Sequence, residues 1–357
     1  MSRGDAYRIA VIPGDGIGAE VIAPTVRALG VLAARGGFAL DVDEFDWSCQ
    51  RYLRTGAMMP ADGLDQIAGH DAILLGAVGW PGVPDHVSLW GLLIPIRRGF
   101  RQYVNLRPIR VMDGLPGPLR DSSGVDFVVV RENVEGEYSE IGGRINRGFP
   151  DEMAVQEAVF TRVGVTRVVD YALDLAAERR GLLTSATKSN GIVHTMPFWD
   201  EIVRERAEAR DGIEWGQEHI DALVAKLVLR PADFDVIVAS NLFGDILSDL
   251  AAAIAGSIGI APAANLNPER DFPSMFEPVH GSAPDIAGRG IANPLGSMWA
   301  AAMMLDHLGE PSAARALMTA IEDTLATGTI RTPDLGGEAT TDQFADAVIA
   351  AIPAVLT

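Results

Sequence analysis

The sequence predicts an α/β protein built on a large, mainly parallel sheet. Short apolar runs rich in Val, Ile and Leu alternate along the chain with segments of helical periodicity. Apolar residues make up 48% of the 357 residues, enough for a sizeable core in either two lobes or one large unit. Internal repeats and low-complexity tracts do not stand out, so a repeat architecture is not favoured.

The expected elements follow in that alternating order. The strand at 7–14 leads into a helix from Ala19 to Ala34, and the C-terminal third returns to helices at 295–309 and 341–352. The remaining runs, each apolar and flanked by turn residues, are expected to be strands at 38–46, 71–78, 125–133, 181–187 and 234–240. Residues 134–160 differ, because strand-like pieces there are joined by Gly-rich turns without a helix. This pattern resembles an extended arm, a common oligomerisation device.

Charge and composition limit the possible partners and the compartment. The formal net charge of −19 argues against nucleic acid, which needs a basic face, but leaves small acidic substrates open. The single cysteine, Cys49, excludes an intrachain disulfide and fits a reducing compartment. The N-terminus lacks a signal-peptide pattern, and the apolar stretch 251–264 is broken by Gly, Ser and Pro. We therefore expect a soluble cytoplasmic protein with no membrane partner.

Asp245 and Asp249 follow the strand that begins at Val236, one helical turn apart in "GDILSDL". This spacing places both carboxylates on one helix face, among apolar neighbours that indicate burial. One interpretation is a helix-dipole aspartate beside a solvated one. The other is a metal site, because buried carboxylates must pair or bind a cation. Oxygen ligands alone suit magnesium or manganese.

The stretch "VIPGDGIGAEV", residues 11–21, lies between a strand and a helix and invites a dinucleotide-binding interpretation. Its glycines at 14, 16 and 18 do not match the Rossmann spacing, and an acidic residue at a clear strand end does not follow about twenty residues later. The stretch instead predicts a tight turn that another group can approach closely.

Further polar side chains stand at expected strand ends or in loops. Most arginines are only solvated, but Arg131 directly follows a buried run, where a guanidinium is well placed to grip a carboxylate. Lys188 in "TSATKSNG" suits either a solvated loop or chemistry, since it is one of two lysines. Tyr138 and Asp221 each have a simpler structural interpretation. Residues 276–294, dense in Gly, Pro, Asp and His, are expected to form a long ordered loop of functional type.

Together these pieces resemble the isocitrate/isopropylmalate dehydrogenase family, the metal-dependent decarboxylating dehydrogenases of 2-hydroxy acids. The likeness runs from Ile9 to about Asp346 and rests jointly on six motifs: "GDGIG", "NLRP", "RENVEGEY", "SATKSNG", "NLFGDILSD" and "FEPVHGSAPDIAGRGIANP". It implies a two-domain fold with a large mixed sheet that is not a Rossmann fold. Residues 1–102 with 256–357 would form a cofactor-side domain, and 103–255 a dimerisation and substrate domain carrying an arm near 134–160.

The resemblance also implies roles for individual residues. Arg97, Arg107 and Arg131 would hold the substrate carboxylates, and Tyr138, Lys188 and Asp221 would handle protons. Asp221, Asp245 and Asp249 would bind Mn²⁺ or Mg²⁺, and K⁺ is a further candidate ion. The cofactor NAD would lie against the residues Ile17, Glu277, His280, Gly281, Ser282, Ala283, Asp285 and Asn293. Lys188 and Asp221 would reach the partner's site in a homodimer.

Within this family the sequence is most like the tartrate and D-malate dehydrogenases, which implies NAD-dependent oxidation with decarboxylation of a small dicarboxylate. Gly191 stands where isopropylmalate dehydrogenases have a valine, three residues after Lys188, and Trp90 with His86 precedes the first arginine. Trp90 is expected to contact substrate, although a packing role is its alternative. The alternative activity is that of 3-isopropylmalate dehydrogenase of leucine biosynthesis. A non-catalytic regulatory paralogue is disfavoured, because every expected catalytic residue is present.

Overall fold

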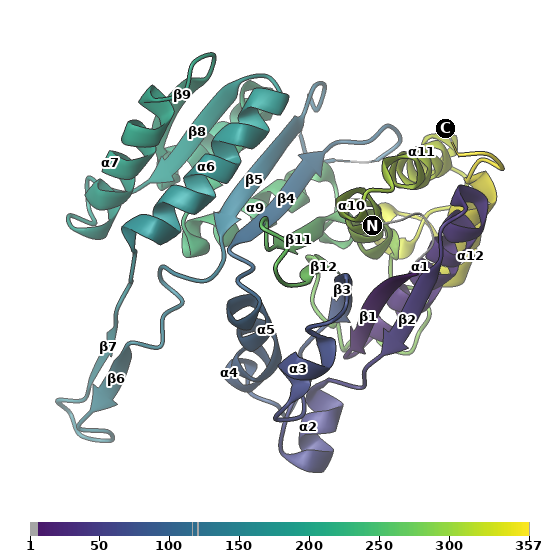
Figure 1. The fold of residues 1–357 in the computed structure, drawn as a ribbon, viewed down its shortest axis with the longest axis horizontal. Helices are drawn as coiled ribbons and strands as arrows, with labels where there is room; N and C mark the ends of the chain where they lie inside the picture. The colour runs from purple at the N-terminus through teal and green to yellow at the C-terminus, as the bar shows by residue number, and fades with distance from the viewer. Residues whose placement is uncertain (1–5, 116, 120, 357) are drawn as a thin grey trace. The chain divides into compact units, whose positions relative to one another are not determined.

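The computed structural model describes residues 6–115, 117–119 and 121–356. The described residues fall into two compact units (Figure 1). Unit 1 takes Met1–Gln102, Arg110–Arg120 and Ala252–Thr357, and unit 2 takes Tyr103–Ile109 and Asp121–Ala251. Each unit has its own set of neighbouring strands, and each is described by itself.

Unit 1 is built on strands in the order β2-β1-β3-β12-β11. The first four are parallel to their neighbours, and β11 runs antiparallel to β12. Consecutive residues of β1, β3, β11 and β12 are buried, as expected for strands covered by helices, whereas β2 at the edge is largely exposed. The bounds are β1 Tyr7–Gly14, β2 Leu40–Glu44, β3 Ala72–Ala77, β11 Pro262–Leu266 and β12 Ser274–Pro278.

Two helices of unit 1 pack directly on these strands. α1 contacts β1 and β3, and α10 contacts β12, β11 and β3, while α11 and α12 pack on the helices themselves. By length and composition alone α1 could cross a membrane, but 56% of its most apolar window is buried, which is typical of a core helix. The bounds are α1 Ile17–Gly36, η3 Ile258–Ile260, α10 Leu295–Leu308, α11 Pro311–Thr327, η4 Pro333–Leu335 and α12 Thr341–Ala351.

A group of short helices in unit 1 packs around an apolar cluster that also includes residues of β1, β3 and β12. Trp47, Met58, Ile67 and Ile96 are among its buried members. The segment η1 is a π-helical turn between α4 and α5, and such turns often occur at functional sites. The bounds are α2 Cys49–Thr55, α3 Gly63–Ile67, α4 Asp85–Ser88, η1 Leu89–Leu93 and α5 Ile94–Gly99.

Unit 2 has strands in the order β4-β5-β10-β8-β9, and the ladders β5–β10, β10–β8 and β8–β9 are parallel. α6 packs on β5, β10 and β8, while α7 packs on α6 and β8 (Figure 1). The bounds are β4 Val104–Arg110, β5 Asp126–Glu132, α6 Arg162–Glu178, β8 Leu182–Thr187, α7 Thr195–Glu208, β9 Glu214–His219, α8 Ile220–Leu229, η2 Pro231–Asp233, β10 Val236–Ala239 and α9 Asn241–Ala255.

An antiparallel two-stranded arm leaves unit 2 between β5 and α6, as Figure 1 shows at its lower left. It consists of β6, Gly142–Ile145, and β7, Met153–Gln156. Every residue of both strands is exposed, including Ile145 and Met153. A role for this arm in oligomerisation remains a prediction.

The predicted fold class is confirmed: α/β, with a sheet that mixes parallel and antiparallel neighbours. Every strand expected from a continuous apolar run is present within two residues of its predicted bounds. Four further strands, β4, β9, β11 and β12, were not among those expected from apolar runs. β11 is hidden in a small-residue stretch, and β12 begins before the expected loop, so residues 276–278 belong to a strand. The cofactor-side and dimerisation roles of the two parts remain predictions.

Candidate active site

The helix α9 carries Asp245 and Asp249 on one face, as its sequence spacing predicts. The expectation that this face is buried in the chain is wrong. The side chains of Asp245 and Asp249 are 34% and 57% exposed, and Ile246 between them is exposed too. Leu247, on the opposite side of the helix, is buried, and so is Ser248, which flanks Asp245 and contacts the same arginine, Arg107. The apolar neighbours therefore indicate only which face packs, and the carboxylates lie on the other one.

Two buried arginines neutralise these carboxylates. Arg131 Nη1 forms a close ion pair with Asp245 Oδ1. Arg107 lies 3.5 Å from Asp245 Oδ1 through Nη2, and 3.6 Å from Asp249 Oδ1 through Nη1. Arg107 projects from β4, and Arg131 from the end of β5. The structure thus brings together four of the predicted substrate and metal residues.

Three polar residues that the sequence analysis missed hold these arginines in place. Asn241 Oδ1 accepts bonds from Arg131 Nε at 3.1 Å and Nη2 at 2.7 Å. Asn105 Oδ1 accepts from Arg107 Nε at 2.7 Å, and Ser248 Oγ from Arg107 Nη1 at 2.6 Å. All three are buried, so the guanidiniums are fixed before any ligand arrives. The sequence carried one usable signal, since Asn241 begins a helix directly after a strand.

Tyr138 joins the same group. Its hydroxyl donates to Asp245 Oδ2 at 3.1 Å, and the Arg131 guanidinium lies 5.7 Å from its ring centre. Partial burial, and then the negative charge of Asp245, raise the pKa of the Tyr138 hydroxyl. A protonated phenol beside a carboxylate site is a suitable general acid.

Lys188 and Asp221 form a separate pair. Lys188 Nζ donates to Asp221 Oδ1 at 2.7 Å, and this bond lowers the pKa of the Asp221 carboxyl. Lys188 follows β8 directly, and Asp221 lies in the first turn of α8. Among the residues that the structure describes, no group of three acidic or metal-binding side chains converges. Within one chain, Asp221 therefore does not lie beside Asp245 and Asp249.

The chemistry of Asp245 and Asp249 fits a hard divalent cation. Although Asp249 is more than half exposed, partial desolvation, and then the Asp245 charge, raise the pKa of its carboxyl. Arg107 and Arg131 oppose this shift without cancelling it. Two carboxylates that repel each other in this way would be stabilised by a cation between them.

In unit 1 the glycine turn meets the loop after β12 through backbone atoms and through the side chain of Ile17. Ile17 N donates to Ser282 O at 2.9 Å. A Cβ atom added to Gly16 would lie 2.1 Å from Ser282 O, and one added to Gly14 would lie 1.9 Å from Ala77 O. Ile17 itself packs near Ala283. The predicted tight turn with a close approach is therefore present, and the approaching group is the predicted cofactor loop.

The loop from Val279 to Pro294 carries the other predicted cofactor residues. Gly281 and Asp285 are exposed, whereas His280, Ser282 and Asn293 are buried. Burial lowers the pKa of His280, which favours the neutral imidazole. Asn293 is held at both ends of its amide, by Asp334 at 3.0 Å and by the backbone N–H of Leu295 at 3.0 Å. Asp334 was not among the predicted residues, since it lies in the distant turn η4.

The remaining predicted residues of unit 1 lie on α5, η1 and β12. Arg97 Nη2 donates to Glu277 Oε1 at 2.8 Å, and Asn265 Nδ2 donates to the same oxygen at 2.7 Å. Trp90 lies in the π-helical turn, with the Arg98 guanidinium 4.9 Å from its ring centre. Arg97 and Glu277 thus form one partly buried pair, and Trp90 belongs to a separate contact.

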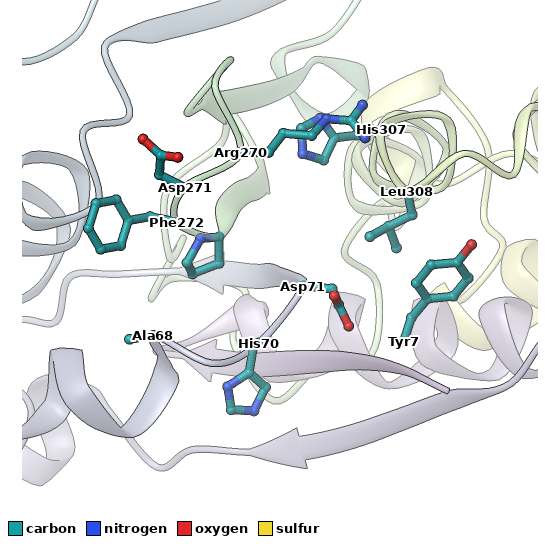
Figure 2. Close-up of a pocket in the computed structure, with 10 residues that line it drawn as sticks. Tyr7, Ala68, His70, Asp71, Arg270, Asp271, Phe272, His307 and Leu308 are labelled. Carbon is teal, nitrogen blue, oxygen red and sulfur yellow. The ribbon is translucent and has the colours of Figure 1, made fainter. Parts of the chain in front are cut away.

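One cavity of unit 1 lies at the other end of the strands. Figure 2 shows this cavity of about 220 Å³, around which Tyr7, Asp71, Arg270 and His307 are placed. Tyr7 begins β1, and Asp71 immediately precedes β3. Ligands of open α/β sheets bind outside the carboxyl ends of the strands, where Gly14 and Ala77 lie. The cavity therefore lies at the wrong end to belong to the cofactor loop.

Comparison with known proteins agrees with this geometry. Residues 8–348 match the model of the isocitrate/isopropylmalate dehydrogenase family. D-malate dehydrogenase [decarboxylating] of Escherichia coli (strain K12) is 56% identical over 96% of this chain and 97% of its own length. Tartrate dehydrogenase/decarboxylase of Pseudomonas putida is 52% identical over 96% of this chain and 97% of its own length.

A solved structure gives the same result. Isocitrate dehydrogenase from Methylococcus capsulatus superimposes with a TM-score of 0.88 at 34% identity, covering 97% of this chain and 99% of that one. The motifs, the fold and the sequence identity of 52–56% over nearly the full length of the chain all agree. This chain is a member of the isocitrate/isopropylmalate dehydrogenase family.

Proposed function

We propose that this protein catalyses the NAD- and divalent-metal-dependent oxidation and decarboxylation of a small 2-hydroxy diacid, D-malate or tartrate. One observation carries the proposal: Asp245 and Asp249 lie beside two fixed arginines and the hydroxyl of Tyr138. The relatives named for D-malate and tartrate, at 56% and 52% identity, support the same activity.

The residues divide the work as follows. Arg107 and Arg131 bind the substrate carboxylates. Asp245 and Asp249, with Asp221 of a second copy, would hold a Mn²⁺ or Mg²⁺ ion, which would supply positive charge beside the substrate's 2-hydroxyl group. Ile17 and the His280–Asn293 loop would hold NAD. Asp285 in that loop disfavours the 2′-phosphate of NADP by charge repulsion.

The protons balance across the reaction. Lys188, held by Asp221, accepts the hydroxyl proton as the hydride leaves C2 for NAD. The C3–carboxylate bond then breaks to release carbon dioxide, and its electron pair remains on the three-carbon product. Tyr138 donates a proton to that carbon. One proton is taken up and one is given back, so D-malate and NAD yield pyruvate, carbon dioxide and NADH.

We further propose a homodimer with shared sites. The Lys188–Asp221 pair is complete within one chain but does not join the Asp245–Asp249 pair there. A second copy supplies the missing carboxylate and the base. The exposed arm β6–β7, with its exposed apolar side chains, is the element that would clasp the partner.

The alternative activity, that of 3-isopropylmalate dehydrogenase, needs an apolar wall for a branched alkyl group. Gly191 has no side chain that could form such a wall. The space around it is open within the described part of the chain, since a Cβ atom there would meet only Lys188 O at 3.9 Å. We therefore favour a substrate with a small or polar group at C3.

The test is a stoichiometric assay with the purified protein, Mn²⁺ and either NAD or NADP. D-malate should yield equal amounts of NADH and carbon dioxide, a chelator should stop the reaction, and Mn²⁺ should restore it. Reduction of NADP at equal or better kcat/KM would contradict the cofactor assignment. Failure to oxidise D-malate or tartrate would contradict the function.

A further inference from the structure

The segment that carries Tyr138 is fastened to the start of α9 by the glutamate next to it. Glu137 Oε1 accepts from Ser240 Oγ at 2.8 Å, and Glu137 Oε2 accepts from the backbone N–H of Leu242 at 3.0 Å. Ser240 directly precedes α9, and Leu242 is its second residue. One side chain thus bridges two segments that are about a hundred positions apart in the sequence.

The bridge holds together two parts of the proposed site. Glu137 precedes Tyr138, whose hydroxyl contacts Asp245 at 3.1 Å. Asp245 lies one turn beyond the N–H that Glu137 binds. The first N–H groups of a helix lack partners within the helix, and a carboxylate that accepts from one of them also complements the helix dipole. Glu137 therefore fixes the register of α9 against the segment that holds the proton donor.

Other contacts close the same junction from a second side. Gly136 N donates to Val159 O at 2.8 Å, and Val159 N donates back at 3.0 Å. A Cβ atom added to Gly136 would lie 3.4 Å from the Asn241 Cβ atom, so the two segments already touch. Asn241 Nδ2 also donates to Glu135 O at 3.1 Å. Among the side chains in these contacts, only that of Glu137 binds both the Ser240 hydroxyl, just before α9, and the Leu242 N–H, within α9.

We propose that Glu137 is a positioning residue for the reaction, which holds the Tyr138 hydroxyl and the α9 aspartates in register. This inference rests on the proposed function, because it assigns a role within the same site. Glu137 touches neither substrate nor cofactor in this account. It acts through Tyr138 and through the start of α9, where a shift of about 1 Å can lower a rate a hundredfold.

A matched control lies two residues away. Glu135 accepts from Thr161 N at 2.9 Å and from Thr161 Oγ1 at 2.7 Å, at the start of α6 rather than of α9. Glu135→Ala thus removes the same kind of helix-end contact from the same segment. It leaves the contacts of Glu137 in place.

Glu137→Ala should lower kcat for D-malate by about 10- to 100-fold while the KM for NAD stays within twofold. It should also weaken Mn²⁺ binding several-fold, measured by electron paramagnetic resonance of free Mn²⁺ without NAD or substrate. Glu137→Gln should restore most of both properties. Its amide oxygen can accept from Leu242 N, and its NH₂ group can donate to the Ser240 hydroxyl. Glu135→Ala should lower the melting temperature but leave kcat and Mn²⁺ affinity near wild type.

The inference is overturned if Glu137→Ala behaves like wild type, if Glu135→Ala lowers kcat equally, or if Glu137→Gln fails to rescue. If Glu137→Ala does not fold, Ser240→Ala replaces it, since it removes one of the two contacts. That variant should shift kcat and Mn²⁺ affinity in the same direction by less, and unchanged values would overturn the inference. A wild-type protein that oxidises neither D-malate nor tartrate would instead refute the proposed function, and the Mn²⁺ titrations would still test the bridge.

Discussion

Asp245 is the residue on which the contacts of the proposed site converge. It accepts from Tyr138 through one carboxylate oxygen and pairs with Arg107 and Arg131 through the other. Two guanidiniums beside it offset its negative charge, and carboxylate oxygens are the ligands that a hard divalent cation prefers. Its exposure of 34% leaves room for a ligand to reach it.

Asp245→Asn should abolish turnover and weaken Mn²⁺ binding at least tenfold, because an amide oxygen is a poorer ligand for a hard cation. Stability should change little, since the amide oxygen can still accept from Arg131 and the NH₂ group can donate to the Tyr138 hydroxyl oxygen. Activity with D-malate, Mn²⁺ titration and thermal unfolding check the three parts. Near-normal activity at saturating Mn²⁺ would rule out the metal assignment.

Glu132 predicts a dependence of stability on pH. It is fully buried and accepts backbone N–H bonds from Val134 and Glu135, yet burial raises the pKa of its carboxyl from 4.5 to about 7. Between these values the folded chain keeps a proton that the unfolded chain has lost. The resulting stabilisation is therefore complete below the unfolded pKa and disappears as pH rises through 7.

Glu132→Gln should remove this pH dependence. Between pH 5.5 and 8, the free energy of unfolding of the wild type should fall by about 2 kcal/mol more than that of the variant. Both pH values lie above the isoelectric point of about 4.6, where the solubility of the protein is lowest. Urea unfolding of both proteins at the two pH values gives the comparison. Parallel changes in wild type and variant would show that Glu132 titrates normally.

At this scale the sequence predicted residue types better than environments. The spacing of Asp245 and Asp249 indicated one helix face, but whether that face is covered depends on the tertiary fold. The partners Asn241, Ser248 and Glu137 were missed for a related reason. Their polar groups acquire a role only through contacts with helix ends and guanidiniums that are distant in the sequence.

Among the elements, the β1–α1 turn shows how a glycine pattern positions a binding loop. Gly16 has φ of 55°, and its lack of a side chain lets Ser282 O approach the backbone. Gly37, at the other end of α1, has φ of 72° but lacks any neighbour within 4 Å of an added Cβ atom. A side chain at either position would be strained by the positive φ. At Gly16 it would also clash with Ser282 O, whereas at Gly37 it would meet no atom of the described residues.

Gly16→Ala should raise the dissociation constant for NAD about tenfold or more, because the added methyl group displaces the loop that begins at Val279. Gly37→Ala should cost roughly 1 kcal/mol of stability from the positive φ alone and leave NAD affinity within twofold. Calorimetric titration and thermal unfolding of both variants separate the two effects. Equal NAD affinity in both variants would contradict the proposed role of this turn.

Strands whose own sequence is a continuous apolar run were predicted. Strands that form only because they pair with a neighbouring strand were not. Continuous apolar runs predicted β1, β3, β5, β8 and β10 because strands covered on both faces need such runs. β11, with the sequence "PAANL", has few β-branched residues and becomes a strand by pairing with β12. The π-helical turn at Trp90 had no sequence signal, since its hydrogen-bond pattern depends on packing.

For the whole molecule, the fold class and family could be predicted because many motifs agree along most of the chain. The segment 134–160 indicated an oligomerisation arm, but the sharing of sites between two copies was predicted only through the resemblance. The separation of Lys188–Asp221 from Asp245–Asp249 gives that prediction a physical basis. A site completed by a second copy makes a clear statement about mixed dimers.

Lys188→Met and Asp245→Asn should each be inactive alone, and mixing the two chains should restore activity. A mixed dimer contains one site with both lesions and one with neither, so random exchange should recover about a quarter of wild-type activity. Heterodimer formation is checked with differently tagged chains. If heterodimers form without any recovery, each site is built within a single chain.

The central claim is that this member of the family acts on a small 2-hydroxy diacid rather than on a branched one. The most direct measurement is the ratio of kcat/KM for D-malate to kcat/KM for 3-isopropylmalate, with NAD and Mn²⁺. Gly191 lacks an apolar wall worth on the order of 1–3 kcal/mol of discrimination, so the ratio should lie above one, by roughly 5- to 150-fold. A ratio below one would contradict the claim.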